Sequence, residues 1–288
     1  MDLIVLLAID VGNTQTVIGV FDEHLVDAGA REPGALHGLV HHWRVTTVRD
    51  RTADEWELEL AQLLGLGGFE LSPGSETADS VGRRPITGMA LSSSVPSVTG
   101  ALRTMFSKET MVPSVIVEPG VKTGMPILYD NPKEVGADRI VNAVAALDLY
   151  DPPIVVVDLG TATTFDAISA SGEYLGGAIV PGIEISMDAL FARAAALRRV
   201  ELVAPRRAIG RTTVESMQSG AIYGYAGLVD GLVARFVAEL GPSTVIATGG
   251  LGGLIAPYAS SVLAYEPWLT LHGLRLIHAR NQQEGEPA

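Results

Sequence analysis

The stretch "LLAIDVGNTQTVIGVFD", residues 6–22, decides the fold because it joins two apolar runs through one short polar turn. Its first run ends at Asp10, Gly12 follows two residues later, and small amide and hydroxyl side chains fill the turn. The same order returns in "VVVDLGTATTFDAIS", residues 155–169, around Asp158 and Gly160. A chain that makes this strand, turn and strand twice predicts two similar halves.

Composition narrows the classes of protein that fit. With 288 residues, 47% hydrophobic and 18% charged, the chain can bury the core of one large or two small domains. The formal net charge of −13 disfavours nucleic acid and anionic membranes as partners, because both need clustered Lys and Arg. The chain has no cysteine, which excludes disulfides and thiolate metal sites and fits a cytoplasmic location.

Strand-like and helix-like periodicities alternate along the chain, which predicts an α/β architecture. The expected strands cover 3–9, 15–21, 42–47, 86–94, 154–158 and 243–248, with a hairpin over 163–180. The expected helices follow the capping box Thr52–Glu55, begin near Ser97, and cover about 184–196, 213–240 and 268–280. We expect an N-terminal half at 1–150 and a C-terminal half at 151–288, with surface insertions at 27–38 and 65–85.

The repeated turn has the chemistry of a phosphate loop. Glycine lets the backbone approach a ligand without a Cβ in the way, and the following residues offer N–H and hydroxyl donors. The aspartates suit magnesium or another hard cation that accompanies phosphates. A third glycine turn, "VIATGGLGG" at 245–253, again follows a strand and precedes a helix. Each signal alone also occurs in ordinary strand-end turns, so the inference rests on their combination.

In combination, these turns resemble the duplicated nucleotide-binding fold of actin, hexokinase, acetate kinase and the heat-shock chaperones. The fold class expected from this resemblance is α/β, with two fused actin-like (ribonuclease H-like) halves and the nucleotide site between them. Within that superfamily, four segments are similar to type III pantothenate kinases: "GVKTGMPILYDNPKEVGADRIVNAVAAL" (120–147), "GEYLGGAIVPGIEISMDALF" (172–191), "IGRTTVESMQSGAIYGYAGLVDG" (209–231) and "ATGG" (247–250). The resemblance covers nearly the whole chain apart from the two insertions and the tail.

This resemblance implies ATP-dependent phosphorylation of pantothenate to 4′-phosphopantothenate, the first step towards coenzyme A. It also implies Mg²⁺ or another divalent ion with ATP, a monovalent cation (K⁺ or NH₄⁺), and a homodimer. Asp10 matches the family's magnesium-oriented residue, Asp158 its monovalent-cation ligand, and Asp138 its proton acceptor. The implied ATP-binding residues are Asp10, Gly12, Asn13, Thr14, Gln15, Thr16, Gly160, Thr161, Thr163, Thr248, Gly249 and Gly250. The implied pantothenate-binding residues are Tyr129, Gly136, Ala137, Asp138, Arg139 and Thr213.

The chemistry of the reaction agrees with the role implied for Asp138. A primary alcohol is a poor nucleophile, and a positioned carboxylate that accepts its proton typically contributes roughly 10²- to 10⁴-fold. The alternative is an early-turn acid that complements the helix dipole, with Arg139 as a surface charge. As sequence neighbours on a helix, Asp138 and Arg139 do not face each other as an ion pair.

Other classes of protein remain as alternatives. A sugar kinase of the same superfamily and comparable length usually carries a cysteine-rich zinc motif, which this sequence lacks. A non-enzymatic accessory factor is expected to have lost the proton acceptor or a residue of a phosphate loop. A filament or chaperone role is disfavoured because no extra subdomain or peptide-binding segment is recognisable. Finally, four glycines within the apolar helix at 213–240 predict close packing, either against a second subunit or inside the monomer.

Overall fold

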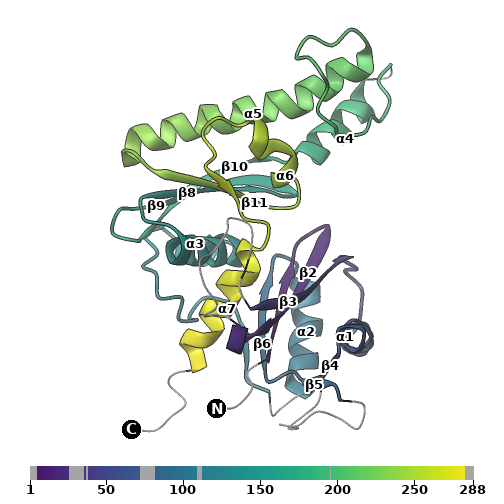
Figure 1. Ribbon diagram of the computed structural model, residues 1–288, viewed down its shortest axis with the longest axis vertical. Helices are drawn as coiled ribbons and strands as arrows, with labels where there is room; N and C mark the ends of the chain where they lie inside the picture. The colour runs from purple at the N-terminus through teal and green to yellow at the C-terminus, as the bar shows by residue number, and fades with distance from the viewer. Residues whose placement is uncertain are drawn as a thin grey trace. The chain divides into compact units, whose positions relative to one another are not determined.

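The computed structural model describes residues 5–25, 36, 38–71, 82–108, 112–194 and 196–282. These residues contain two five-stranded sheets with the same topology (Figure 1), in the orders β3-β2-β1-β6-β7 and β10-β9-β8-β11-β12. In the first sheet, β1 forms an antiparallel hairpin with β2 and pairs in parallel with β6. In the second sheet, β8 likewise forms an antiparallel hairpin with β9 and pairs in parallel with β11. The shared order confirms the prediction of two similar α/β halves.

The first sheet and its helices follow the expected positions closely. Its strands are β1 (Val5–Val11), β2 (Gln15–Asp22), β3 (Leu39–Thr46), β6 (Gly88–Ser93) and β7 (Ser114–Ile116). A separate pair of short strands is β4 (Phe69–Glu70) and β5 (Arg84–Pro85). The helices are α1 (Ala53–Leu66), α2 (Pro96–Lys108) and α3 (Ala137–Leu149), with short 3-10 turns η1 (Glu23–Leu25) and η2 (Pro132–Glu134).

The second sheet has β8 (Ile154–Leu159), β9 (Ala162–Ile168), β10 (Tyr174–Pro181), β11 (Thr244–Thr248) and β12 (Ala264–Tyr265). Its helices are α4 (Ile183–Arg193), α5 (Thr213–Leu240) and α6 (Gly252–Ile255), with the 3-10 turn η3 (Ala256–Tyr258). The last helix is α7 (Leu269–Gln282). Helix α4 ends earlier than the predicted residue 196, because Ala194 leaves the helical conformation at its C-cap.

The chain divides into two compact units that do not follow chain order. The first consists of Met1–Gly124, Asn131–Ala145 and Thr270–Ala288, and the second of Met125–Asp130 and Ala146–Leu269. Helix α7 belongs to the first unit because it packs on β2 and β6. A Cβ at Gly19 would lie 2.7 Å from Leu271 Cδ1, and a Cβ at Gly88 would lie 2.7 Å from His278 Cε1. The predicted division at residue 150 follows chain order. The observed division differs because α7, although it comes last in the chain, packs on the N-terminal sheet.

The core of the first unit lies on one face of β1, whose continuous apolar run is buried on both faces. Alternate residues of β1 (Val5, Leu7 and Ile9) join the cluster that contains Trp56 of α1 and Leu102 of α2. All five side chains are almost completely buried. One face of the sheet is therefore covered by α1 and α2, while Gly19 and Gly88 admit α7 by having no side chain.

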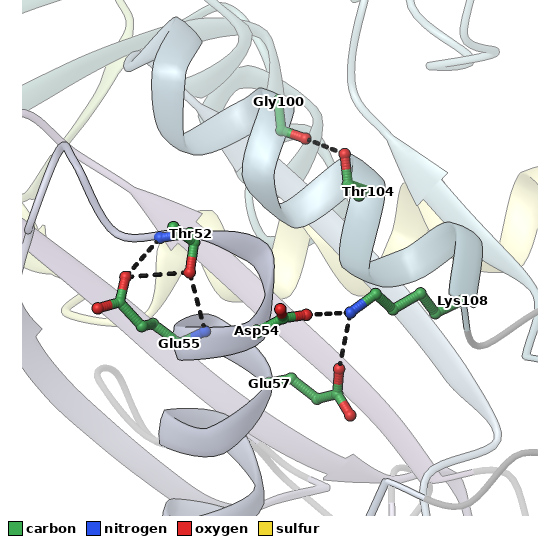
Figure 2. A network of polar contacts seen from close by, with 7 residues as sticks. All are labelled: Thr52, Asp54, Glu55, Glu57, Gly100, Thr104 and Lys108. Atoms are coloured by element: carbon green, nitrogen blue, oxygen red, sulfur yellow. Dashed lines mark hydrogen bonds and ion pairs between the residues drawn. The ribbon is translucent and has the colours of Figure 1, made fainter.

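Helices α1 and α2 are also joined by polar contacts at the surface (Figure 2). The predicted capping box of α1 is confirmed, since Thr52 Oγ1 accepts the Glu55 N–H at 3.3 Å and the Thr52 N–H donates to Glu55 Oε2 at 2.7 Å. Lys108 at the end of α2 donates to the carboxylates of Asp54 and Glu57 in α1. These exposed ion pairs contribute little energy individually, so burial of Trp56 and Leu102 is the main force that joins the helices.

The second unit buries its sheet against α5, which lies along one face in Figure 1. Val155, Val157 and Phe165 of the sheet pack with Ile222 and Val229 of α5 in one hydrophobic cluster. The predicted hairpin over 163–180 is confirmed as β9 and β10, which pair antiparallel. The second polar turn lies between the end of β8 and the start of β9. Both strands that flank this turn contribute side chains to the hydrophobic cluster.

The predicted insertions are described only in part. Residues 27–35, 37 and 72–81 lie outside the described residues, as does the tail after Gln282. The ends of the second segment are not irregular as expected, because α1 continues to Leu66 and the strands β4 and β5 form a parallel pair.

Candidate functional site

The first polar turn, Gly12 to Thr14, joins β1 to β2 at the end of the first sheet. It is closed by a hydrogen bond of 3.0 Å from the Gly12 N–H to the Gln15 carbonyl. Asn13, Thr14 and Gln15 are exposed, so their polar groups face solvent. Asp10 lies one residue before the end of β1, beside Ser92 of the parallel strand β6. The structure therefore places an aspartate and a tight turn where the carboxyl ends of two parallel strands meet, a position where ligands bind in open α/β sheets.

The residues that follow β3 hold this turn from the side. Thr47 Oγ1 donates to the Gly12 carbonyl at 2.7 Å, and the Thr47 N–H donates to the Thr14 carbonyl at 3.0 Å. The Thr16 hydroxyl is completely buried and lies 2.9 Å from that of Thr47. Thr16 thus supports the turn from behind, whereas Asn13 and Thr14 form its accessible surface.

Two further residues contact the tip of the turn. Asn13 Nδ2 donates to Ser94 Oγ at 3.3 Å, and Arg49 Nη2 donates to Asn13 Oδ1 at 3.2 Å. Sequence reasoning missed Thr47, Arg49 and Ser94 as neighbours of the turn. The run of serines that ends the strand at 86–94 was the available signal for Ser94, since it matches the position of the glycines after β11.

The second polar turn, Gly160 and Thr161, joins β8 to β9 and is tighter. The Gly160 N–H donates to the Ala162 carbonyl at 3.0 Å. A Cβ at Gly182 would lie 2.2 Å from the Thr161 carbonyl oxygen, and one at Gly249 would lie 2.4 Å from Asp158 Oδ1. Three backbone segments therefore meet here only because glycine stands at both approach points. Sequence reasoning found Gly249 but missed Gly182.

The third turn, after β11, lies directly beside Asp158. Thr248 pairs with Asp158 in the parallel register, is buried, and donates its hydroxyl to the Glu266 carbonyl at 2.7 Å. The Tyr265 hydroxyl donates to the Gly249 carbonyl at 3.0 Å, while Gly250 is exposed. The structure therefore brings the predicted residues Asp158, Gly160, Thr161, Thr248 and Gly249 together in the second unit. Thr163 lies behind them, completely buried.

Asp138 lies in the first turn of α3, and Gly136 creates the space for its carboxylate. A Cβ at Gly136 would lie 2.6 Å from Asp138 Oδ1, which also accepts the Arg139 N–H at 2.9 Å. Burial raises the pKa of Asp138 above its usual range, although this hydrogen bond and the Arg139 charge act in the opposite direction. Arg139 is 8% exposed, so the alternative of a surface charge at this position is wrong.

The predicted substrate residues Tyr129 and Thr213 belong to the second unit. Tyr129 packs over Gly176, where a Cβ would lie 3.1 Å from its ring, and its ring centroid lies 6.4 Å from that of Tyr174. Tyr174 in turn donates its buried hydroxyl to Asp166 at 2.8 Å. Thr213 is exposed at the start of α5, and among the described residues no hydrogen bond joins it to Tyr129.

The described protein side chains near these turns supply too few ligands to hold a hard cation alone, so phosphate and water oxygens would supply the others. Within the described part of the chain, no cluster of three or more His, Asp or Glu side chains could hold a metal ion. Asp10 offers one carboxylate beside the exposed first turn, which suits Mg²⁺ because this ion commonly takes one or two carboxylates plus phosphate and water oxygens. Asp158 offers a carboxylate beside the backbone carbonyls of the second turn.

Comparison with known proteins decides the family. A family model described as type III pantothenate kinase matches residues 6–235. The chain belongs to the type III pantothenate kinase family. A type III pantothenate kinase of Streptomyces avermitilis is 54% identical over 282 residues, covering 96% of this chain and 98% of the relative. One of Moorella thermoacetica is 51% identical over 277 residues, covering 96% and 99%. The chain is therefore a kinase of coenzyme A biosynthesis that transfers phosphate to pantothenate.

Solved structures agree on the fold. A Campylobacter jejuni protein described as a conserved putative Baf family transcriptional activator matches with a TM-score of 0.55 at 19% identity, over 96% of this chain and 99% of that one. A reductive activator for a corrinoid, iron-sulfur protein matches with a TM-score of 0.50 at 12% identity, over 97% and 61%. At these identities the likeness concerns the two-sheet architecture alone.

Proposed function

We propose that, in the phosphorylation of pantothenate by this kinase, Asp138 accepts the proton of the attacking hydroxyl. The observation that carries the proposal is the position of Asp138, whose half-buried carboxylate fills the space left by Gly136. Burial raises the pKa of this carboxyl, which makes it a stronger base than an exposed aspartate. It stays far below the pKa of an alcohol, so proton transfer accompanies formation of the bond to phosphorus.

The two turns supply the ATP ligands in this proposal. The exposed residues Asn13, Thr14 and Gln15 of the first turn and Thr161 and Gly250 near the second present donors to phosphate oxygens. The buried members of the set, Thr16, Thr163 and Thr248, hold these turns in shape. Gly12, Gly160 and Gly249 keep the backbone accessible. Pantothenate is bound by Tyr129, Gly136, Ala137, Arg139 and Thr213.

Two ions complete the proposed site. Asp10 orients Mg²⁺, or another divalent ion, which shields the phosphate charge when bound. Asp158 binds a monovalent cation, K⁺ or NH₄⁺. The neighbouring carbonyls of Gly160 and Thr161 are oxygen donors suited to such an ion, and Gly182 keeps their surroundings free of a side chain.

We further propose that the kinase is a cytoplasmic homodimer joined along α5. This helix is long and apolar enough to cross a membrane by length and composition, but it carries Asp230, whose carboxylate binds the backbone and hydroxyls of Ser260 and Ser261. A half-buried carboxylate with four hydrogen bonds to neighbouring protein groups belongs to a helix packed on protein. A stripe of small residues at helical spacing lies along α5: Thr213, Ser216, Gly220, Gly224, Gly227, Gly231, Ala234 and Ala238.

Space around this stripe is open in the monomer. Within the part of the chain that the structure describes, a Cβ at Gly220, Gly224, Gly227 or Gly231 would meet no atom within 4 Å. This open space supports packing against a second subunit over burial inside the monomer, the competing explanation for these glycines. Each glycine costs up to ~1 kcal/mol in a helix relative to alanine, and close approach of a second α5 helix would offset that cost.

The activity itself is tested by incubating the purified protein with ATP, Mg²⁺, K⁺ and pantothenate and measuring phosphopantothenate by mass spectrometry. Asp138→Asn keeps the shape of the side chain but weakens its basicity, so turnover is expected to fall by roughly 10²-fold or more while ATP binding is kept. Asp148→Asn, near the exposed end of the same helix, is the matched control. Turnover of Asp138→Asn within about threefold of wild type would refute the proton-acceptor role.

The dimer is tested separately by sedimentation of Gly224→Leu and Gly227→Leu at assay concentration. Both variants are expected to lose dimer and activity together, because leucine prevents close approach of the helices. Gly100→Leu is the control, since this glycine is also exposed in a helix with open space around it. An active wild-type monomer would exclude the dimer.

A further inference from the structure

Arg49 lies beside the first turn and, like Arg44 and Arg280, forms no ion pair with a carboxylate among the described residues, in contrast to several other arginines of the first unit. Arg84 pairs with Asp22, Arg103 with Glu118 and Arg275 with Glu23. Arg49 is exposed, and among the described residues no Asp or Glu forms an ion pair with it. In a chain with a net charge of −13, an uncompensated guanidinium beside a polar turn is an unusual local charge.

The position of Arg49 is fixed at both its backbone and its side chain. Its carbonyl accepts the Ser97 hydroxyl at 3.0 Å, near the start of α2. Its Nη2 donates to Asn13 Oδ1 at 3.2 Å, and Asn13 Nδ2 donates onward to Ser94 Oγ at 3.3 Å. The guanidinium is therefore held at the tip of the first turn by a neutral amide, which leaves its charge and most of its five N–H donors available.

The residues of the first turn carry no positive charge of their own, so a cation that binds a phosphate there must come from outside the turn. Residues 10–16 contain Asp10 and no Lys or Arg. Arg44, the other nearby cation, lies within β3 and donates to Gln15 Oε1 at 3.0 Å, at the base of β2. Arg49 instead contacts Asn13 at the tip of the turn, and Asn13 also contacts the end of β6, the strand that runs parallel to β1 beside Asp10.

We propose that Arg49 is a phosphate-binding residue of the first turn and contacts the phosphate chain of ATP. The inference rests on the proposed assignment of this turn to the phosphates. Arginine donates two parallel hydrogen bonds to a phosphate and keeps its charge at any working pH. Asn13 holds the guanidinium in place before the nucleotide arrives, which lowers the entropy that its ordering would otherwise cost on binding.

The test compares ATP with adenosine, which lacks the phosphates. Dissociation constants for ATP, ADP and adenosine are measured by calorimetry for wild type, Arg49→Ala, Arg49→Lys and the control Arg103→Ala. Arg49→Ala is expected to weaken ATP and ADP by about 10-fold or more and to leave adenosine within about twofold, because charge-assisted hydrogen bonds to phosphate are lost. Arg49→Lys is expected to recover part of the ATP affinity, and Arg103→Ala to match wild type.

Kinetics give a second measurement on the same variants. The KM for ATP is expected to rise with Arg49→Ala by a similar factor, while the KM for pantothenate stays within about twofold. Equal weakening of ATP and adenosine would show that Arg49 only supports the turn and would overturn the inference, as would unchanged ATP affinity. Wild type that binds ATP but makes no phosphopantothenate would refute the proposed reaction while leaving the comparison of nucleotides valid.

Discussion

The two polar turns occupy equivalent places in sheets of the same topology, yet they are held in different ways. Asp10 and Asp158 stand at matching register positions, as do Thr16 and Thr163 on the returning strands. The first turn is held by side-chain hydrogen bonds from Thr47 and Asn13. The second is held by close backbone packing that glycine permits at residues 182 and 249.

This difference shows that one geometry can be reached by two kinds of sequence. Hydrogen bonds from side chains tolerate small shifts, because each partner can rotate to follow the other. Backbone packed against backbone has no such freedom, since carbonyl groups cannot move without disturbing the strands that carry them. We therefore expect the first turn to respond gradually to substitution and the second to respond abruptly.

The largest expected difference comes from adding one methyl group to each turn. Gly182→Ala places a Cβ 2.2 Å from the Thr161 carbonyl, so we expect it to lower the free energy of unfolding by about 3 kcal/mol or to prevent folding. Gly12→Ala places a Cβ 3.0 Å from the Gln15 carbonyl, which a small shift can relieve, and we expect a loss of about 1 kcal/mol. Urea unfolding measures both, and equal losses would contradict the contrast between the turns.

The next effect separates the two aspartates by the ion that each serves. Asp10→Ala is expected to raise the Mg²⁺ concentration for half-maximal activity by about 10-fold and Asp158→Ala to raise that for K⁺ by a similar factor, because hard cations depend on carboxylate oxygens. Each ion is titrated with the other saturating. A variant that shifts the Mg²⁺ and K⁺ titrations equally would contradict the assignment of Mg²⁺ to Asp10 and K⁺ to Asp158.

A smaller effect compares the two buried threonines. Thr16→Val removes a hydroxyl that lies 2.9 Å from Thr47 Oγ1 and leaves that group without one partner, so we expect a loss of about 1–2 kcal/mol. Among the described residues, Thr163 Oγ1 is buried with no hydrogen-bond partner. Thr163→Val is therefore expected to be neutral or slightly stabilising. Thermal unfolding of the two variants gives the comparison, which fails if Thr163→Val is the more damaging.

The smallest expected effect is a dependence of the free energy of unfolding on pH. It arises from Asp138 of α3, which belongs to neither turn. Burial raises the pKa of Asp138 in the folded state, so its contribution to stability is complete below the unfolded pKa and is lost as pH rises through the folded value. Asp138→Asn cannot ionise, and we expect it to be more stable than wild type at neutral pH by no more than about 1 kcal/mol. The two proteins should converge in acid, as unfolding measured against pH would show.

The same group predicts a pH profile for activity. Because the proposed base must be ionised, kcat/KM of the wild type is expected to fall on the acid side at a higher pH than an ordinary aspartate would give. A profile that is flat down to the usual aspartate range would contradict the role of Asp138.

Local sequence was sufficient for the longer strands and helices and for the turns that begin directly after strands, but not for the short elements β4, β5, β7 and β12. The runs that end at Asp10 and Asp158 predicted their strands because a continuous apolar run and a glycine turn are local properties. The capping box at Thr52 located the start of α1 for the same reason.

What the sequence could not show came from contacts between distant segments. Thr47 and Arg49 reach the first turn only because β3 pairs with β2 in one particular register. Gly182 matters only because β10 returns beside the second turn. Arg139 is buried by tertiary packing, which no local pattern reports. The pairing of β4 with β5 likewise joins residues on either side of the segment 72–81.

The return of α7 to the N-terminal sheet has a consequence for the order in which the chain can fold during synthesis. Domains commonly fold as they emerge, N-terminal first. Here Leu271 and His278 of α7 pack against Gly19 and Gly88 of the sheet. The first unit therefore stays incomplete until α7 has left the ribosome. The second unit, whose residues end at Leu269, has its whole sequence available earlier. The unit that contains β1 is thus completed after the second unit, and a ribosome that stops short of α7 releases a protein whose N-terminal sheet lacks the cover of α7 at Gly19 and Gly88.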